Sequence, residues 1–504
     1  MRRIPLLAGT KVLIAAAPDD AVVVRPPAPG AAVADVAAAV RDALRFPLEG
    51  EPLEALVSRR SRATIVVEPP ALPIPGSAAD PRQPAVGAVV DELERLGIPS
   101  GYQTILVACG LARRTTQREL EALVTRGLAR RFHGSVVVHD AEDTELVTVD
   151  GASRPPLRVS RAIAETDLVV VVSAAETVLH GGPAALLAAS GADAQRAAGA
   201  YSLLETTASQ GWHLALALER AVARRVPLMG VSLVLNHPRT SGAVRGYPYE
   251  PDALERIARS PLRRAFGALP DFARREILDS LQTELTAAAA FAGPPSVAHA
   301  EALLRAVELR RAELDAPLDA VVIGIPGTTP FLPRERPNPL LAAYLGLGLA
   351  LRLWRDAFPV VEGGTAILAH SFTRHFAHPT QQPYRPFFHV ARVGRDPELL
   401  AEAERTAAAN ARALEGYRAG LTVHPLLPFR DWNACQPAIG RLGAVIVAGA
   451  GDAAAVRQLG FVPAHGLSAA LELARGRTSG DARIGYLLCP PYFPLRMRDY
   501  VSPR

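Results

Sequence analysis

Two loops carry residues that could bind an anion or move a proton. The first is His180-Gly181-Gly182-Pro183, which follows an apolar strand pattern ending near Ser173 and precedes a helix pattern. Backbone N–H groups and the dipole at the start of a helix favour a carboxylate or phosphate, and paired glycines let a ligand approach the backbone. The alternative is a loop that uses glycine to reach a positive φ angle. The sequence leaves both interpretations open.

The second loop follows the expected strand Thr104–Ala108. Its Arg113 and Arg114 could bind a carboxylate through paired hydrogen bonds. Thr115, or Thr116 beside it, could cap the helix that comes next. The alternative for the two arginines is a solvated pair beside acidic residues of that helix. These residue types therefore predict a substrate-binding loop at the end of a strand.

Histidines supply the candidates for proton transfer. His139 ends an expected strand and precedes Asp140, so a carboxylate could hold the imidazole as a base. A cap at the strand end is an equally good explanation. His180 in the first loop is a second candidate.

Four further histidines fall within twenty residues, a spacing that raises the alternative of a zinc site and a zinc hydrolase. Prolines interrupt regular structure in this segment, and no carboxylate accompanies the cluster. Packing is therefore the favoured explanation. The four residues are His370, His375, His378 and His389.

Short β-branched runs alternate with amphipathic helix patterns along the chain. This alternation predicts an α/β fold with largely parallel sheets and helices on both faces. Ligands in such sheets bind at the carboxyl ends of the strands. The loops of interest therefore follow Glu68, Cys109, His139 and Ser173.

The pattern of elements restarts after a charge-rich helical segment, which predicts two α/β domains. We expect an N-terminal domain over residues 1–292, a connecting helix over 293–316 and a C-terminal domain over 317–478. The remaining residues, 479–504, form a tail that we expect to pack back on the N-terminal domain.

Composition excludes several classes of protein. The 504 residues carry a net charge of +5, but the basic residues are scattered and only 5% of the residues are aromatic, which argues against nucleic-acid binding. Apolar stretches are shorter than the ~18 residues that span a bilayer. Three widely spaced cysteines form no disulfide framework. We therefore expect a cytosolic protein without nucleic-acid or membrane partners.

Lysine is almost absent from the chain. Of the 55 basic residues, Lys11 is the only lysine, so 55 minus 1 leaves 54 arginines. A lysine Schiff base, a P-loop lysine or a lysine-anchored cofactor has this single residue to use, in the first expected strand pair. Such mechanisms are disfavoured.

Taken in order, the segments resemble the nickel-pincer lactate racemase family, also called DUF2088. The shared features are strand-to-loop junctions, a Gly-x-x-Arg loop, a Gly-Gly turn into a helix and an Ala-His at the connecting helix. They lie at residues 65–75, 107–113, 139–140, 165–172, 181–187, 205–213, 298–299, 319–327, 338–345 and 362–364.

The resemblance implies racemisation or epimerisation of 2-hydroxy acids by hydride transfer to a nickel-bearing pincer nucleotide fixed to a lysine. It implies that Arg113 binds the substrate carboxylate and that His213 is equivalent to a nickel ligand. The chain departs from the family where Gly-Gly-x-Lys becomes Gly181-Gly182-Pro183-Ala184. Alanine cannot bond a cofactor, so covalent attachment of the pincer is not expected, and the cofactor stays unassigned.

These observations predict a lactate racemase-like protein with an interdomain cleft for a small anionic ligand, a carboxylate of the 2-hydroxy acid type. As an enzyme it would be a divergent racemase or epimerase, with His180, His213 or His139 as proton carrier. The alternative is a catalytically inactive relative that acts as a ligand sensor or a partner subunit, since several catalytic positions of the family are replaced together.

Overall fold

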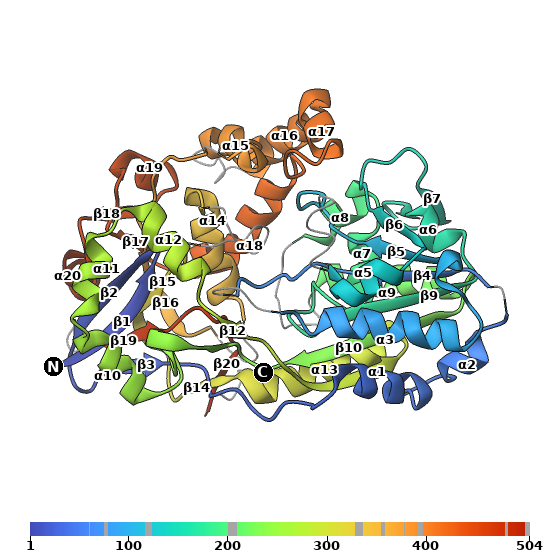
Figure 1. Ribbon diagram of the computed structural model, residues 1–504. Helices are drawn as coiled ribbons and strands as arrows, with labels where there is room; N and C mark the ends of the chain where they lie inside the picture. Colours follow the sequence, from blue (N-terminus) through green and yellow to red (C-terminus); the bar gives the residue numbers. More distant parts are fainter. Residues whose placement is uncertain are drawn as a thin grey trace.

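Two lobes, each built on a six-stranded sheet, make up the computed structural model of this chain (Figure 1). It describes all residues except 60, 75–78, 116–122, 200–208, 328–335, 354–357, 377, 391–396, 479–481 and 499–504. The expected α/β class is confirmed. Within the described residues, every helix is too short or too polar to cross a membrane.

The sheet of the first lobe has the order β13-β10-β9-β4-β5-β6, and only its edge strand β13 runs antiparallel to its neighbour. Strands β4 and β9 are valine-rich and buried along their whole length, as expected for parallel strands covered on both faces. The strands are β4 (Ala63–Val67), β5 (Gln103–Val107), β6 (Ser135–Val138), β9 (Leu168–Ala174), β10 (Leu228–Leu235) and β13 (Ala287–Gly293).

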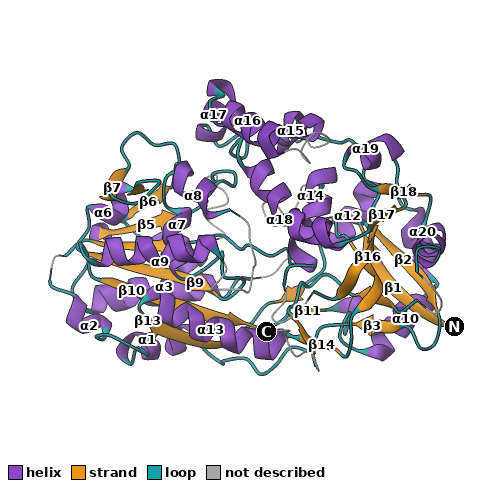
Figure 2. Cartoon of the chain, turned by 180° about the vertical axis from the view of Figure 1, so that it is seen from behind, coloured by secondary structure: helices purple, strands orange, loops and turns teal. Residues whose placement is uncertain are grey.

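Helices cover both faces of this sheet (Figure 2). Apolar side chains of α1 and α3 pack with one face of the strands, and those of α7 and α9 pack with the other. The helices are α1 (Val36–Arg45), α2 (Leu53–Leu56), α3 (Arg82–Arg95), α5 (Arg126–Arg131), α6 (Arg161–Ala164), α7 (Pro183–Ala188), α8 (Ala192–Ala198), α9 (Gln210–Ala223) and α13 (Pro295–Arg310). A small hairpin, β7 (Val147–Asp150) with β8 (Leu157–Val159), lies beside them.

The sheet of the second lobe has the order β18-β17-β16-β15-β19-β3, and all of its pairings are parallel. One face packs against a hairpin formed by β1 and β2, and the other packs against α14, a π-helical turn and α18. The strands are β1 (Arg2–Ala8), β2 (Lys11–Ala17), β3 (Val22–Val24), β15 (Leu318–Gly324), β16 (Val360–Ala369), β17 (Ala444–Ala448), β18 (Val462–Ala464) and β19 (Ile484–Leu487).

The helices of the second lobe include a group that extends toward the first lobe, formed by α15, α16 and α17 (Figures 1 and 2). Asn410 caps the start of α17 and so separates it from α16. The helices are α10 (Pro251–Arg259), α11 (Leu262–Ala268), α12 (Asp271–Asp279), α14 (Pro339–Ala343), the π-helix Tyr344–Ala350, α15 (Tyr384–Val390), α16 (Pro397–Ala408), α17 (Ala411–Arg418), α18 (Leu427–Arg441), α19 (Ala453–Gln458) and α20 (Leu467–Arg475).

The strand pairing divides the chain differently from the domain boundaries that we expected from the sequence, which were 1–292, 293–316 and 317–478. The first 24 residues and helix α10 pack in the second lobe, where Leu254 joins the core beneath the hairpin. The tail, residues 479–504, joins the sheet of the second lobe, where it pairs with β3 from the first 24 residues of the chain. Its β19 lies between β15 and β3, and β20 (Leu495–Met497) pairs with β14 (Ala312–Leu314). The tail takes this position because it carries apolar residues, such as Leu487, that are buried in the second lobe.

Replacing Leu487 by alanine tests the buried position of β19 between β15 and β3. Leu487 is 2% exposed, so we expect Leu487→Ala to lower the free energy of unfolding by about 2–5 kcal/mol, since the lost methyl groups leave a cavity. Urea denaturation followed by circular dichroism measures the change. Leu473→Ala is the control, because that leucine is 44% exposed and its loss should cost under about 0.5 kcal/mol. Equal effects of the two substitutions would contradict the buried position of β19.

Candidate functional site

Glu68 follows β4 directly and marks the candidate site. Its side chain is buried, and its Oε2 accepts a hydrogen bond of 2.6 Å from the N–H of Gly181. Burial raises the pKa of Glu68 to about 8, and the neighbouring Glu176 carboxylate raises it further, against the lowering effect of the Gly181 N–H. At neutral pH the group is therefore mostly protonated and can donate a hydrogen bond.

His180 lies in the loop after β9, close to Glu68. The Nδ1 of its ring lies 2.7 Å from Oγ1 of Thr177, which fixes the orientation of the imidazole. Removal from water lowers the pKa of His180 to about 3, and the positive charge of Arg430 lowers it further. His180 is therefore neutral at physiological pH, although the residue retains partial exposure.

Arg430 comes from the other lobe, on α18. Its charge acts on the pKa values of both Glu68 and His180, which places the guanidinium near them across the junction of the lobes. Arg430 is half-buried, and no described carboxylate lies within ion-pair distance of it. We call Glu68, His180 and Arg430 the junction site.

A buried aspartate follows Arg430 in the sequence. Asp431 accepts a short hydrogen bond from the hydroxyl of Tyr384, while its Oδ1 has no hydrogen-bond partner among the described residues. Burial raises the pKa of Asp431 to about 6, against the opposing effect of Arg430. Below about pH 6 Asp431 is therefore mostly protonated, and it then offsets little of the positive charge of Arg430.

A buried ion-pair network supports the first-lobe side of the junction site. Arg82 pairs with Asp80 at 2.7 Å and with Glu176 at 3.3 Å. Glu176 also accepts a hydrogen bond of 2.7 Å from the N–H of Ala71. The network thereby fixes the proline-rich loop after β4 against the loop after β9, and Arg82 is not free to bind a ligand.

Gly181 and Gly182 pack closely against His299. Their φ angles are +93° and +53°, and their N–H groups already donate to Glu68 and to Oγ of Ser173. A Cβ added at Gly182 would lie 2.3 Å from Cβ of His299. The positive φ angles and the close approach of His299 agree with the positive-φ explanation, and the predicted anion-binding role of these glycines stays a prediction.

His299 stands behind this loop and is fully buried. Its Nε2 lies 3.1 Å from the carbonyl oxygen of Thr177, and its Nδ1 lies 3.1 Å from Oγ of Ser232. The carbonyl can only accept, so Nε2 carries the proton and Nδ1 accepts from the serine. Burial lowers the pKa of His299 to about 4, which keeps it neutral. It positions the loop after β9.

Arg113 and Arg114 do not form a free carboxylate clamp. Nη1 of Arg113 lies 3.5 Å from the carbonyl oxygen of Gly420 in the second lobe, and Nη2 of Arg114 donates to the carbonyl of Val138 at 3.1 Å. Arg114 also donates to the carbonyl oxygen of Arg418. The guanidinium groups therefore hold backbone carbonyls in this structure, and the predicted substrate role of the two arginines stays a prediction.

The hydroxyl of Thr115 lies 3.1 Å from Sγ of Cys109. The start of the helix that Thr115 or Thr116 is predicted to cap falls on residues 116–122, outside the described residues, so this role stays a prediction. Thr125 caps α5, which begins later in the chain.

Further contacts link the same segments of the two lobes. The hydroxyl of Tyr417 donates to the carbonyl of Gly110 at 2.9 Å and accepts from the N–H of Ala141 at 3.2 Å. Nε2 of His424 lies 3.0 Å from a carboxylate oxygen of Glu142. We call the contacts of residues 417–424 with residues 110–142 the lobe bridge. They hold α17 and the segment after it against the first lobe.

The other predicted histidines lie outside the junction site. His139 is buried, and its Nε2 donates to the carbonyl of Ser190 at 2.9 Å, while burial lowers its pKa to about 4. His213 is exposed on α9. No contact between either histidine and the junction site is found among the described residues, so their roles as proton carrier or nickel ligand stay untested predictions. The neighbouring Glu205 and Thr206 lie outside the described residues.

The histidine cluster of residues 370–389 is explained by local hydrogen bonds. Nδ1 of His370 accepts from the N–H of Phe372 at 3.1 Å, and Nδ1 of His378 lies 2.7 Å from the hydroxyl of Thr380. Within the described parts of the chain, no three His, Cys, Asp or Glu side chains converge on a possible metal position. Packing therefore remains the better interpretation of these residues.

The residues present do not fit a lysine-linked pincer. Ala184, at the position that matches the family lysine, is 2% exposed and packs in the apolar core beneath α7 and α9. Lys11 is the only lysine of the chain and lies on β2 in the second lobe. No reaction step is therefore assigned to such a group.

Part of the junction site is predicted by the sequence. The loops after Glu68 and Ser173, including His180, are predicted because the carboxyl ends of parallel strands lie at the same edge of a sheet. The protonated state of Glu68 is not predicted, since it depends on burial of the side chain in the folded chain. Arg430, one of 54 arginines, is not predicted either, because it lies in a helix without any local motif.

The comparisons with known proteins agree with this architecture. Residues 9–181 match the family model described as the lactate racemase N-terminal domain. The lactate racemase apoprotein from Thermoanaerobacterium thermosaccharolyticum superposes with a TM-score of 0.64 at 15% identity, over 98% of this chain and 100% of that chain. A protein from Thermotoga maritima gives 0.50 at 10% identity, over 93% and 100%. No curated protein matches the chain. At these identities the structures establish the fold alone.

The protonated state of Glu68 predicts a specific dependence of stability on pH. The folded state keeps this proton up to about pH 8, whereas an unfolded glutamate releases it near its ordinary pKa of about 4.5. Between these values the folded state holds more protons, so the free energy of unfolding of the wild type should fall, relative to Glu68→Gln, as pH rises from 5 to 8. The relative loss should reach a few kcal/mol, since one pKa unit is worth about 1.4 kcal/mol.

Urea denaturation at intervals of half a pH unit measures this difference. The control is Glu54→Gln, because Glu54 is exposed. A constant difference between wild type and Glu68→Gln over this pH range would contradict a protonated Glu68.

Proposed function

For a chain that is lactate racemase-like in its fold and in its N-terminal sequence, we propose binding of a small carboxylate of the 2-hydroxy acid type at the junction of the lobes. One observation carries the proposal. The positive charge of Arg430 lowers the pKa values of Glu68 and His180, and Arg430 forms no ion pair with a described residue. The ligand would supply the negative charge that this arrangement lacks.

Arg430 is suited to bind the carboxylate. A guanidinium group presents parallel N–H donors that match the two oxygens of a carboxylate, and partial burial strengthens the interaction. Because a partly desolvated charge is costly without a partner, ligand binding also removes that cost. The nearby Asp431 accepts a hydrogen bond from Tyr384, and no ion pair between Asp431 and Arg430 is found in the described structure.

Glu68 and His180 are suited to bind a hydroxyl group. Protonated Glu68 can donate a hydrogen bond, and the neutral imidazole of His180 can accept or donate through Nε2, since Nδ1 faces Thr177. A 2-hydroxy acid carries a hydroxyl beside its carboxylate. Its carboxylate would lie against Arg430, and its hydroxyl would lie against the first lobe.

The lobe bridge favours a role as ligand sensor. A ligand that contacts Arg430 and His180 touches both lobes, so its binding free energy favours the closed arrangement held by Tyr417 and His424. Ala112 and Ala184 stand where the resemblance places a histidine and a lysine. We therefore favour a ligand-binding protein without racemase turnover, acting as a sensor or partner subunit.

A divergent racemase or epimerase is the second candidate. The pairing of a protonated carboxyl, Glu68, with a neutral imidazole, His180, favours it, because these two groups can donate and accept a proton on one ligand. In this role the pair would act on the 2-hydroxy acid held by Arg430.

Isothermal titration calorimetry with L-lactate, D-lactate and glycolate tests binding. We expect Arg430→Gln to raise the dissociation constant at least tenfold, since a charged hydrogen bond contributes roughly 1.5–3 kcal/mol. Arg457→Gln is the matched control, because Arg457 is an exposed arginine of the same lobe. Unchanged binding in Arg430→Gln, or no binding of any of the three acids to the wild type, would refute the proposal.

Chiral chromatography of lactate incubated with the protein in deuterated water separates the two roles. The sensor role predicts unchanged enantiomer composition and no deuterium at the α-carbon. Interconversion of enantiomers that is lost in His180→Asn would support the racemase candidate instead. Interconversion that persists in both His180→Asn and Glu68→Gln would show that neither residue transfers the proton.

A further inference from the structure

Thr177 lies beside His180 in the loop after β9 and is fully buried. Its hydroxyl oxygen accepts a hydrogen bond of 3.2 Å from the N–H of Leu179 and lies 2.7 Å from Nδ1 of His180. Its carbonyl oxygen accepts a hydrogen bond of 3.3 Å from the backbone N–H of His180. Thr177 therefore contacts both the ring and the backbone of the histidine in the junction site.

Thr177 is itself held by buried groups of the first lobe. Nε2 of His299 donates to the carbonyl oxygen of Thr177 at 3.1 Å, and Nδ1 of His299 lies 3.1 Å from the hydroxyl of Ser232. The preceding residue, Glu176, is held by its ion pair with Arg82. The backbone of Thr177 therefore has a defined position relative to the ring of His180.

The hydroxyl hydrogen of Thr177 determines which nitrogen of His180 carries a proton. A hydroxyl group has one hydrogen to donate, and Nδ1 of His180 is the acceptor that the described residues offer it. If Nδ1 carried the ring proton, this buried hydrogen would lack an acceptor, which is unfavourable. The single proton of the neutral ring therefore lies on Nε2.

Nε2 is the nitrogen of His180 that is available to a ligand. Among the described residues, none accepts a hydrogen bond from it, and the side chain keeps partial exposure. A neutral ring with its proton on Nε2 donates at that nitrogen and cannot accept there. Arg430 also has only donors, and Glu68 keeps a proton at neutral pH. Each group of the junction site therefore presents a donor to a ligand.

We propose that Thr177 is a positioning residue, which holds the proton of His180 on Nε2 and so makes this histidine a hydrogen-bond donor to the ligand. The assignment of the proton depends on contacts within the loop alone. Its effect on recognition rests on the proposed binding of a 2-hydroxy acid, whose hydroxyl oxygen would accept from Nε2. An acid without that hydroxyl leaves the N–H without an acceptor and should bind less tightly.

The nitrogen chemical shifts of the His180 ring test the position of the proton without any ligand. In full-length protein that carries isotopically labelled histidine, the signals of His180 are those that disappear in His180→Asn. We expect Nε2 to have the shift of a protonated ring nitrogen and Nδ1 to have that of an unprotonated one. The reverse assignment in the wild type would overturn the proposal.

Thr177→Val tests whether the hydroxyl is responsible, because valine has nearly the same shape. We expect the shifts of the two ring nitrogens to approach each other in this variant, since both tautomers are then populated. Thr177→Ser keeps the hydroxyl and should retain the wild-type shifts. Unchanged shifts in Thr177→Val would overturn the role of Thr177. If Thr177→Val fails to fold, as judged by thermal unfolding, Thr177→Ala replaces it.

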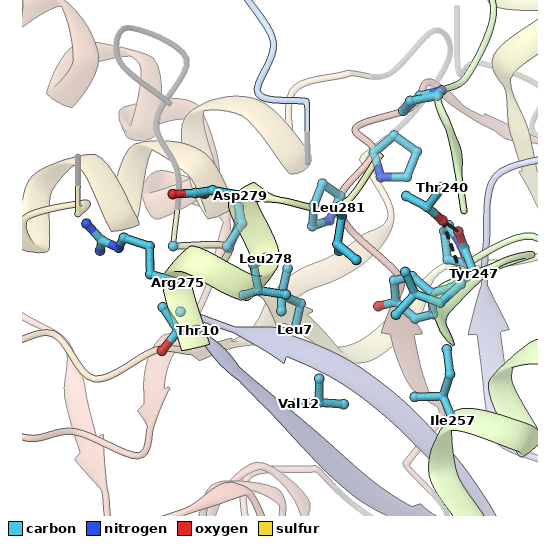
Figure 3. Close-up of a pocket in the computed structure, with 18 of the residues that line it drawn as sticks. Leu7, Thr10, Val12, Thr240, Tyr247, Ile257, Arg275, Leu278, Asp279 and Leu281 are labelled. Atoms are coloured by element: carbon cyan, nitrogen blue, oxygen red, sulfur yellow. Dashed lines mark hydrogen bonds between the residues drawn. The ribbon is translucent and has the colours of Figure 1, made fainter. Parts of the chain in front are cut away.

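Thr240→Val is the matched control, because it removes a threonine hydroxyl elsewhere. The hydroxyl of Thr240 donates to the carbonyl oxygen of Val244 at 3.1 Å, in a pocket of the second lobe (Figure 3). None of the described residues that line this pocket belongs to the junction site. The shifts of His180 should therefore stay unchanged in Thr240→Val, and an equal change in both valine variants would overturn a specific role of Thr177.

Calorimetric titration with L-lactate and propionate measures the consequence for the ligand, because propionate lacks the hydroxyl. We expect the wild type to bind lactate at least about threefold more tightly than propionate, Thr177→Val to reduce this ratio to below about twofold, and Thr177→Ser to restore it. A wild-type ratio in Thr177→Val would overturn the role of Thr177 in recognition. Failure of the wild type to bind lactate would refute the proposed function, whereas the shifts decide the position of the proton independently.

Discussion

The hydrogen bond from the Gly181 N–H to the buried carboxyl of Glu68 is the interaction on which the junction site depends. It joins the end of β4 to the loop after β9, and so it fixes the position of His180 relative to the sheet. The bond requires a glycine with positive φ, because His299 packs where a Cβ would lie. Burial of the carboxyl then keeps its proton, which turns an acidic residue into a neutral donor.

Charge at the junction is distributed unequally between the lobes. On the first-lobe side, Arg82 pairs with the carboxylates of Asp80 and Glu176, Glu68 keeps its proton and His180 is neutral. The second lobe contributes Arg430, for which no ion pair is found among the described residues. Other arginines hold backbone carbonyls, as Arg113 does at Gly420.

Local sequence patterns predicted the α/β class, most strands of both sheets and the loops at their carboxyl ends. These features follow from short-range periodicity, as in the buried valine run of β9. The lobe boundaries could not be predicted in this way, because β3 pairs with β19 across most of the chain and nothing local specifies that partner. The same holds for Arg430, whose proposed role depends on the meeting of the two lobes. It also holds for Arg113 and Arg114, each of which contacts a carbonyl oxygen that lies 307 or 304 positions away.

The pairing of β3 with β19 has a consequence for the biosynthesis of the chain. The strands of the first sheet lie within residues 63–293, so that lobe has all its strands when a little over half of the polypeptide has left the ribosome. The second sheet cannot be completed until residues 484–487 emerge, although its hairpin is synthesised first. Apolar residues of the N-terminal hairpin, such as Leu6, are therefore exposed to solvent during most of translation, because the sheet that buries them is not yet complete. Chaperone contact during synthesis is expected to concentrate on this hairpin.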